Sequence, residues 1–380
     1  MAAWDGDVEK LEILLKNGAR PTVQDISGDT ALHWAAGNGN SPAVACIAEH
    51  LTASNSIDAI DLKNKKGDTA LHAAAARTSQ SQATSTLLKY GANLSSGNFG
   101  NTPLHVAVMH DNRPTVEILL RHLSANRTTD IIEFKNFNGQ TAFHLATSPE
   151  MLNVLLKNNA KLSTANDGKT TLHYAVRKND LQAVECILKY LKEMNLMEII
   201  ELKCLNGETA LHWATAHGPD IEVLRILLKY NASVTAQDND GDTPLHWAVV
   251  YNNAQAVGCL AEHQQTRSVN AVEIKNSTGS TPLHLAAAAV RDAKVLSVLL
   301  LFNPKLCAKD GNGNTALHIA ASRGNVGAVD IILKEVTAYR LKTDKSDFVN
   351  LKNKLGKTAR QLAAMMKNNN LLQVFNKYNL

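Results

Sequence analysis

Aromatic residues, cysteines and long apolar runs are all scarce in this 380-residue chain. Aromatic residues make up 5% of it, so large rings cannot fill its core, and alanine and leucine must carry the packing. The five cysteines form no Cys-x-x-Cys pair, which favours a reducing, intracellular and cytoplasmic setting over a disulfide framework. No stretch approaches the roughly 18 apolar residues of a membrane helix, and the segment 1–10 lacks the apolar run of a secretory signal.

A large excess of positive or of negative charge is also lacking. Lys and Arg number 39 against 35 Asp and Glu, which gives a net charge of +4 without a basic block. This balance argues against a protein that binds nucleic acid through phosphate contacts. A hydrophobic content of 44% is too high for a disordered chain, and the length exceeds the roughly 150 residues of one typical domain.

A tetrad of Thr, any residue, Leu or Phe, and His recurs along the chain, and a glycine stands two residues before each threonine. Glycine supplies a turn with positive φ, and threonine is a good helix N-cap. An alanine-rich helix follows, then a turn and a second helix with apolar residues at helical spacing. Because neither helix face is buried within one unit, neighbouring units must stack. The tetrads lie at 30–33, 69–72, 102–105, 141–144, 170–173, 209–212, 243–246, 281–284 and 315–318.

The run Gly-x-Thr-Pro-Leu-His followed by alanines resembles the ankyrin repeat. The resemblance covers essentially the whole chain and implies an all-α repeat solenoid of about eleven helix-turn-helix units with β-turn fingers. It predicts one ankyrin-repeat domain over 1–380. Within it we expect a partial N-terminal repeat over 1–27, nine repeats over 28–355 and a C-terminal capping repeat over 356–380, where the tetrad histidine is replaced by Gln361.

Long and short repeats alternate. The spacing between successive tetrad glycines is 39, 33, 39, 29, 39, 34, 38, 34 and 43 residues. The long repeats share a motif in which apolar and charged residues alternate, which predicts an extended arm of the finger after a lengthened second helix or loop. The alternation indicates that a two-repeat module was duplicated in tandem. The motif occupies 60–64, 132–136, 200–204, 272–276 and 349–353.

The histidines and cysteines are predicted to be structural. Nine of the fourteen histidines belong to the tetrad, where the resemblance implies a hydrogen bond that ties the finger to its neighbours. The others, His50, His110, His122, His217 and His263, lack the spacing of metal ligands. We therefore expect no catalytic residue, cofactor or metal. Cys46, Cys186 and Cys259 share one position with Ile118 and Ile331, which predicts a core site; Cys204 and Cys307 are expected to be exposed.

The resemblance implies protein binding through the fingertips and the exposed ends of the first helices, on the concave face. Large apolar residues there are usual hot-spot material, although packing against the adjacent finger is an alternative explanation. The tryptophans that follow a tetrad histidine, Trp34, Trp213 and Trp247, are expected in the core, where the family carries a buried leucine. The predicted partner-binding residues are Phe99, Met109, His110, Phe137, Arg177, Lys178, Leu205, His217 and Tyr251.

The lysines of the long-repeat motif and the shortest repeat each allow a functional and a structural interpretation. The lysines of the long-repeat motif, Lys63, Lys135, Lys203, Lys275 and Lys352, would form a row that meets an acidic partner, unless they pair with the acid that lies two residues earlier in four of the five copies. The unit from Gly139 to Gly168 is the shortest, and its link between helices is cut at Pro149. This deletion predicts a notch between Met109 with His110 and Arg177 with Lys178, beside Phe137; a tolerated deletion without a role is the alternative.

These patterns predict a monomeric scaffold or adaptor that binds another protein, and neither nucleic acid, a small-molecule substrate nor an inserted membrane. The 36 asparagines resemble the composition of ankyrin-repeat effectors that intracellular bacteria secrete into the host cytosol. The alternative is the recognition arm of a longer enzyme whose catalytic domain lies outside this chain. Either way, the identity of the partner is not encoded in any motif.

Overall fold

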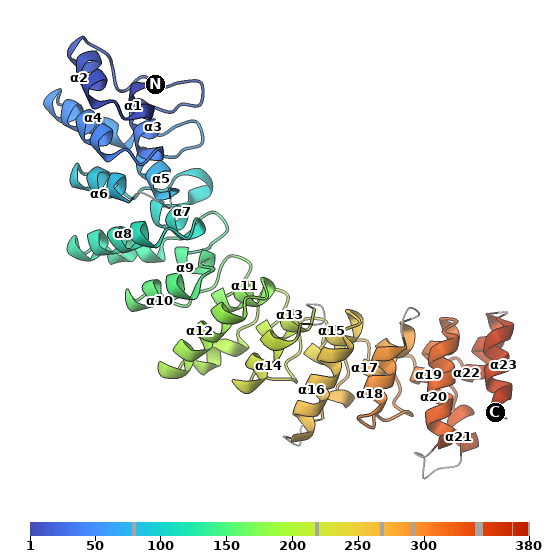
Figure 1. Cartoon of the computed structure of the whole chain (residues 1–380). Helices are drawn as coiled ribbons and strands as arrows, with labels where there is room; N and C mark the ends of the chain where they lie inside the picture. The colour runs from blue at the N-terminus through green and yellow to red at the C-terminus, as the bar shows by residue number, and fades with distance from the viewer. Residues whose placement is uncertain are drawn as a thin grey trace. The chain divides into compact units, whose positions relative to one another are not determined.

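Helix pairs joined by turns make up the computed structural model of the chain, which describes residues 1–77, 81–216, 220–266, 270–289, 293–338, 345–366 and 368–378. No strand occurs among these residues, and eleven helix pairs follow one another along the chain (Figure 1). The predicted all-α repeat array is therefore confirmed. The structure divides into two compact units, one of 1–175 with 182–190 and one of 176–181 with 191–380.

In the first unit the first helices of successive pairs pack in one row and the second helices in another. The unit shares α11 (Thr171–Arg177) and α12 (Leu181–Glu193) with the second unit. Its other helices are α1 (Ala2–Asp5), α2 (Val8–Lys16), α3 (Ala31–Gly37), α4 (Ser41–Ala53), α5 (Ala70–Ala75), α6 (Gln82–Lys89), α7 (Pro103–Met109), α8 (Arg113–Ala125), α9 (Ala142–Leu145) and α10 (Pro149–Lys157), with the 3₁₀ helices η1 (Ile57–Asp61), η2 (Asn98–Gly100) and η3 (Thr129–Glu133).

The second unit repeats this arrangement. Its helices are α13 (Ala210–Ala216), α14 (Glu222–Lys229), α15 (Pro244–Val250), α16 (Ala254–Thr266), α17 (Pro282–Ala288), α18 (Lys294–Leu300), α19 (Ala316–Ser322), α20 (Val326–Ala338), α21 (Lys345–Val349), α22 (Ala359–Met365) and α23 (Asn369–Lys377), with the 3₁₀ helices η4 (Met197–Glu201) and η5 (Ala271–Glu273).

Alanine and leucine fill the core of both units, as the scarcity of aromatic residues predicts. Leu32, Ala35 and Ala36 of α3 are buried, and equivalent residues are buried in the later first helices. Phe143 and Phe375 are the largest fully buried side chains in the described part of the chain. Small side chains let the first helices approach closely, so that stacking buries both faces that a single pair leaves open.

Each first helix begins at its tetrad through a reciprocal cap. The backbone N–H of Thr30 donates to Nδ1 of His33 at 3.2 Å, and the same pair of atoms lies 3.1–3.2 Å apart in the other eight tetrads. The first helices therefore satisfy an N-terminal donor with a side chain three residues on, as in a capping box.

The tetrad histidine also joins each unit to the next finger. Nε2 of the tetrad histidine lies 2.9–3.1 Å from a backbone carbonyl oxygen further along the chain in His33, His72, His105, His144, His212, His246, His284 and His318. Because Nδ1 accepts from threonine, Nε2 carries the proton and donates to that carbonyl. The predicted structural role of the tetrad histidines is confirmed.

The fingers are turns and not paired strands. Gly28 shows why the tetrad glycine is needed: its φ is +80°, and an added Cβ would lie 2.6 Å from the backbone nitrogen of Lys65 in the next finger. Lys65 N in turn donates to Ser27 O at 3.0 Å. One such backbone bond between neighbouring fingers does not make a ladder, so the described fingers contain no strand.

The alternation of long and short repeats has a simple structural basis. The second helices of the long repeats, α4, α8, α12, α16 and α20, each have 13 residues. Those of the short repeats have seven to nine. The predicted lengthening of the second helix is therefore confirmed.

The expected extended arm of the long-repeat motif is partly wrong, because a 3₁₀ helix covers its first residues in four repeats and α21 in the fifth. The apolar residue that starts the motif is the reason. Ile60 at the end of η1 is buried, as are Ile132 and Ile200 in η3 and η4. A tight helical turn brings that side chain under the lengthened second helix, and the chain becomes extended only afterwards.

Candidate functional site

Large apolar side chains stand in solvent at the fingertips and at the ends of the first helices. Phe99 and Phe137 occupy neighbouring fingertips of the first unit, and Phe137 is 75% exposed. Its backbone N–H donates to Phe99 O at 3.0 Å, and its ring lies against Gly100, where an added Cβ would be 2.6 Å from Cδ1. Phe137 thus combines a large exposed surface with packing against the preceding finger, and its role in binding stays a prediction.

Phe99 is held in an unusual backbone conformation. Its φ is +53° and its ψ is 21°, within η2. A bulky residue with positive φ is rare because its Cβ crowds the carbonyl oxygen, and such outliers gather at functional sites. The exposed ring of Phe99 and its positive φ therefore make this fingertip a candidate for binding.

The other predicted residues of the first unit lie where the sequence placed them. Met109 ends α7 and is exposed, and His110, its C-cap, is exposed as well. In the second unit Leu205 is an exposed fingertip residue and Tyr251 is the exposed C-cap of α15. Their exposure shows that they do not fill the core, and their role in binding stays a prediction.

The remaining predicted residues are divided between the two units. Arg177, at the end of α11, and Lys178 are exposed and belong to the second unit. Met109, His110 and Phe137 belong to the first. A common site for both groups stays a prediction. His217 lies outside the described residues.

The first helix of the shortest repeat ends early, as its deletion predicts. Helix α9 has four residues, against seven in α7, and its C-cap Ala146 is extended with ψ at 130°. Ser148 then caps α10, its hydroxyl accepting from Met151 N at 3.2 Å, and Pro149 takes the first helical position. The last turn that α7 and the other seven-residue first helices present to solvent is absent here.

The tryptophans that follow a tetrad histidine are not core residues, which corrects the sequence-based expectation. Trp34 is 41% exposed, and Trp213 and Trp247 are half-buried. Each indole N–H donates to a carboxylate of its own finger, at 3.0, 2.8 and 2.8 Å, and the acceptors are Asp25, Glu208 and Asp238 respectively. Leu145 and Leu285 hold the same position and are half-buried as well, so this position lies at the edge of the core, and the indole adds a hydrogen bond to the finger.

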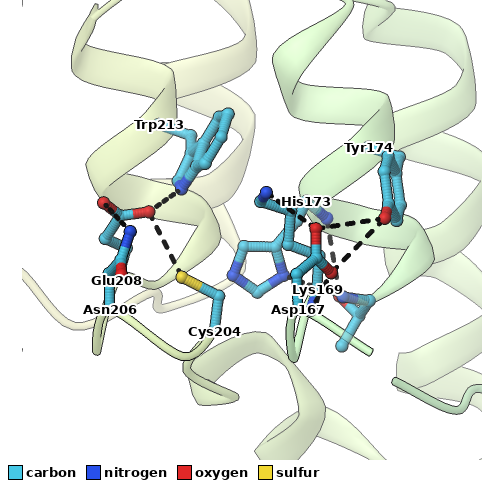
Figure 2. A network of polar contacts seen from close by, with 9 residues as sticks. Asp167, Lys169, His173, Tyr174, Cys204, Asn206, Glu208 and Trp213 are labelled. Carbon is cyan, nitrogen blue, oxygen red and sulfur yellow. Dashed lines mark hydrogen bonds and ion pairs between the residues drawn. The ribbon is translucent and has the colours of Figure 1, made fainter. Parts of the chain in front are cut away.

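Tyr174 occupies the same position and makes a related contact. Its hydroxyl lies 3.4 Å from both carboxylate oxygens of Asp167 (Figure 2). Lys169 donates to Asp167 at 2.8 Å, and although burial alone would raise the pKa of Asp167, this hydrogen bond and ion pair lower it. Burial raises the pKa of Tyr174. The aromatic ring is thus fastened to a charged carboxylate.

Cys204 is buried and not exposed as expected. Its thiol lies 3.2 Å from Glu208 Oε2, the oxygen that also accepts from Trp213 (Figure 2). Burial and the bond to the carboxylate raise the pKa of Cys204. A thiol held protonated is a poor nucleophile. Conversely, Cys46, Cys186 and Cys259 are half-buried and not core residues, as are Ile118 and Ile331 at the same position.

Four of the five lysines of the long-repeat motif form hydrogen bonds to the next repeat. Lys63 donates to Ser96 O at 2.7 Å, and the corresponding bonds of Lys135, Lys203 and Lys275 are 2.6–2.8 Å long. The acid two residues earlier also bonds to the next repeat, as an acceptor: Asp61 accepts from the backbone N–H of Asn93 at 3.0 Å. These lysines therefore form neither a row of free cations nor pairs with the neighbouring acids. The lysines and the acids instead join each long repeat to the repeat that follows it.

Buried asparagines at the start of the long second helices escaped the sequence analysis. Asn325 caps α20 by accepting from Ala328 N at 3.0 Å, and its amide donates to Ala289 O at 2.8 Å in the preceding repeat. Asn112 and Asn253 are buried at the same position. The recurrence of Asn or Asp directly before these helices was the available signal.

The described residues hold neither three metal-binding side chains close together nor a helix long and apolar enough to cross a membrane. Within the second unit, a cavity of about 550 Å³ beside Trp247 and Tyr251 is lined by carboxylates. The candidate site is thus a set of exposed apolar and aromatic side chains with acidic neighbours, suited to binding and without a catalytic arrangement in the described parts.

Comparison with known proteins points to one family. The family described as ankyrin repeats (3 copies) matches overlapping segments over nearly the whole chain: 1–96, 47–131, 128–198, 148–238, 187–271, 216–310, 264–343 and 288–379. Its matches therefore extend from the first helix pair to the last.

Similar proteins carry these repeats within longer chains. Inversin from Canis lupus familiaris is 31% identical over 207 residues, covering 51% of this chain and 18% of inversin. The E3 ubiquitin-protein ligase KEG from Arabidopsis thaliana is 29% identical over 360 residues, covering 89% of this chain and 20% of KEG. This chain thus spans about a fifth of these relatives.

A solved structure shows the same fold. The ankyrin repeat domain of Bcl-3, described as a unique member of the IkappaB protein family, is 28% identical, with a TM-score of 0.54. The likeness covers 61% of this chain and 98% of the Bcl-3 domain.

Proposed function

Because this chain belongs to the ankyrin-repeat family, we propose that it is an intracellular adaptor that recognises another protein through its fingertips and the exposed ends of its first helices. Ankyrin-repeat domains in general mediate protein–protein interaction. The observation that carries the proposal is the exposure of Phe99, Phe137, Leu205 and Tyr251 on a framework that buries most of its other apolar residues. Exposed aromatic anchors on a preorganised backbone are typical of binding hot spots.

The centre of the binding surface is proposed to lie at the shortened repeat, beside Met109 and Phe137 of the first unit; Arg177, in the second unit, is proposed as a further binding residue. The early end of α9 supports this choice, since it removes a turn that would otherwise occupy the surface. The positive φ of the neighbouring Phe99 adds to it.

The proposal is tested with a triple variant, Met109→Ala, Phe137→Ala and Arg177→Ala. A protein partner captured by the intact chain is first identified, and its affinity for the variant is then measured. We expect a loss of at least tenfold with an unchanged melting temperature. The matched control replaces exposed apolar residues away from this surface, Ile13, Met194 and Leu301, and should keep the wild-type affinity. A correctly folded triple variant with wild-type affinity would refute the site.

A second function is supported by the small fraction of its relatives' length that this chain covers. A ligase such as KEG carries similar repeats in a chain about five times as long, which supports a role as the recognition arm of a longer enzyme. Reading the natural gene on both sides of this sequence for a catalytic motif tests that role. A role as a bacterial effector stays a prediction from composition, and the relatives named above are animal and plant proteins.

A further inference from the structure

The cavity beside α15 combines aromatic rings with negative charge. Its volume is about 550 Å³, and Trp247 and the C-cap residue Tyr251 provide its rings. Four carboxylates also line it, three from one finger and one from the finger before: Asp238, Asp240, Asp242 and Glu208. All of these residues lie within the second unit.

The charge of this cavity is opposite to that of the whole chain. No lysine or arginine is among its lining residues, although the chain carries a net charge of +4. A concave surface that collects charge of one sign focuses the field on a ligand of the other sign. The complementary ligand is therefore a cation.

The rings are held in place before any ligand arrives. The indole N–H of Trp247 donates to Asp238 Oδ2 at 2.8 Å. The Trp247 ring lies 5.7 Å from the buried His212 at an interplanar angle of 74°, and 5.6 Å from Tyr251 at 41°. Tyr251 is 54% exposed. Tryptophan is the aromatic ring that attracts cations most strongly, and fixing it in advance lowers the entropy lost on binding.

The arrangement of the carboxylates favours an extended organic cation over a metal ion. Asp238 Oδ1 accepts the backbone N–H groups of Asp240 and Asp242 at 3.0 and 2.8 Å, so it is committed to the turn. Asp242 Oδ1 accepts from Asn276 at 2.9 Å. Among the residues that the structure describes, no three potential metal ligands converge. A guanidinium group offers five N–H donors in a plane and a flat face for stacking, which suits dispersed carboxylates beside a ring.

We propose that this cavity is a receptor for an arginine side chain presented by a basic segment of a protein partner. The inference rests on the proposed function, because it specifies the chemistry of the partner. The guanidinium group lies over Trp247, and its N–H groups donate to the cavity carboxylates, with Asp240 the most exposed of the finger acids to receive them.

The test uses the full chain and a fluorescent twelve-residue Gly/Ser peptide that carries three arginines. Two matched peptides carry citrulline, which keeps the shape without the charge, or lysine. Binding is followed by anisotropy at low and at physiological salt. We expect the arginine peptide to bind, the citrulline peptide to bind at least tenfold more weakly, and added salt to weaken binding. Equal binding of the citrulline peptide, or of the lysine peptide, would overturn the assignment to arginine.

Two variants use residues that this fold already accepts. Trp247→Leu copies Leu285, which follows the tetrad histidine of α17, and Asp240→Asn copies Asn206 before the tetrad glycine of an earlier finger. Each is expected to weaken peptide binding about tenfold, since a cation–π contact or a direct ion pair is removed. Trp34→Leu removes an equivalent tethered indole outside the cavity and should leave binding unchanged within twofold.

The outcome separates this inference from the proposed function. If no peptide binds but the intact chain still captures a protein whose binding depends on Phe137 and Met109, the cavity assignment fails and protein recognition stands. If Trp247→Leu and Trp34→Leu weaken peptide binding equally, the attraction comes from the surface as a whole and the cavity is not the site.

Discussion

Replacing His144 with glutamine isolates the effect of one buried histidine on acid stability. His144 lies in the shortened repeat, accepts the backbone N–H of Thr141 at Nδ1 and donates from Nε2 to Ser163 O at 2.9 Å. Protonation of Nδ1 would turn that acceptor into a donor facing another donor. Glutamine preserves the cap, because Gln361 already serves this way, with Thr358 N donating to its side-chain oxygen at 3.0 Å.

The magnitude follows from the pKa of His144. Burial lowers it from 6.5 to about 4, so over this range the unfolded chain binds more protons than the folded chain. Stability from this group is therefore complete above pH 6.5 and is lost as the pH falls toward 4. At about 1.4 kcal/mol per unit of pKa, the full loss is about 3 kcal/mol, of which about 2 kcal/mol is reached at pH 5.

The assay is urea unfolding followed by circular dichroism at pH 7.5 and pH 5. The free energy of unfolding of the wild type should fall between these pH values by about 2 kcal/mol more than that of His144→Gln. A repeat at 0.5 M NaCl is the control, since screening weakens surface charge effects and leaves a buried group unaffected. If the difference between the two proteins stays the same at both pH values, the argument from burial is refuted.

Three further substitutions test the repeat architecture, each by urea unfolding. His246→Ala should destabilise by ~1–3 kcal/mol through lost buried hydrogen bonds and affect binding only indirectly; unchanged stability with lost binding would make this histidine functional. Cys204→Asn should stabilise by about 1 kcal/mol, because Asn136 at the same position accepts two backbone N–H groups at 3.0 Å; a loss of stability would contradict this. Asn325→Ala should destabilise by about 2 kcal/mol, since the carbonyl of Ala289 loses its donor; no change would show that water replaces the amide.

The sequence was sufficient for most properties that depend on local periodicity, although the extended arm that it predicted for the long-repeat motif begins as a helical turn. Positive φ at the tetrad glycine, the cap at threonine and the alternation of repeat length all follow from residues within one unit, because turns and caps are decided by neighbours in the chain. The same holds for the early end of α9, which a deletion and Pro149 predicted. An exposed fingertip such as Phe137 was also predictable, since it lies in a turn that no helix covers.

The positions of side chains that form hydrogen bonds outside their own helix were decided only by the tertiary structure. Trp34 was expected in the core because the ankyrin-repeat family carries a buried leucine at this position, yet a carboxylate nine residues earlier in the chain holds its indole at the surface. Lys63 was expected either to pair with an acid or to meet a partner, yet its ammonium group donates a hydrogen bond to a backbone carbonyl 33 residues away. The cavity at Trp247 depends on an acid from the preceding finger. The Trp34 contact lies within one repeat, whereas the other two join residues about one repeat apart. In both cases the periodicity that predicts the helices carries no information about which polar atoms meet.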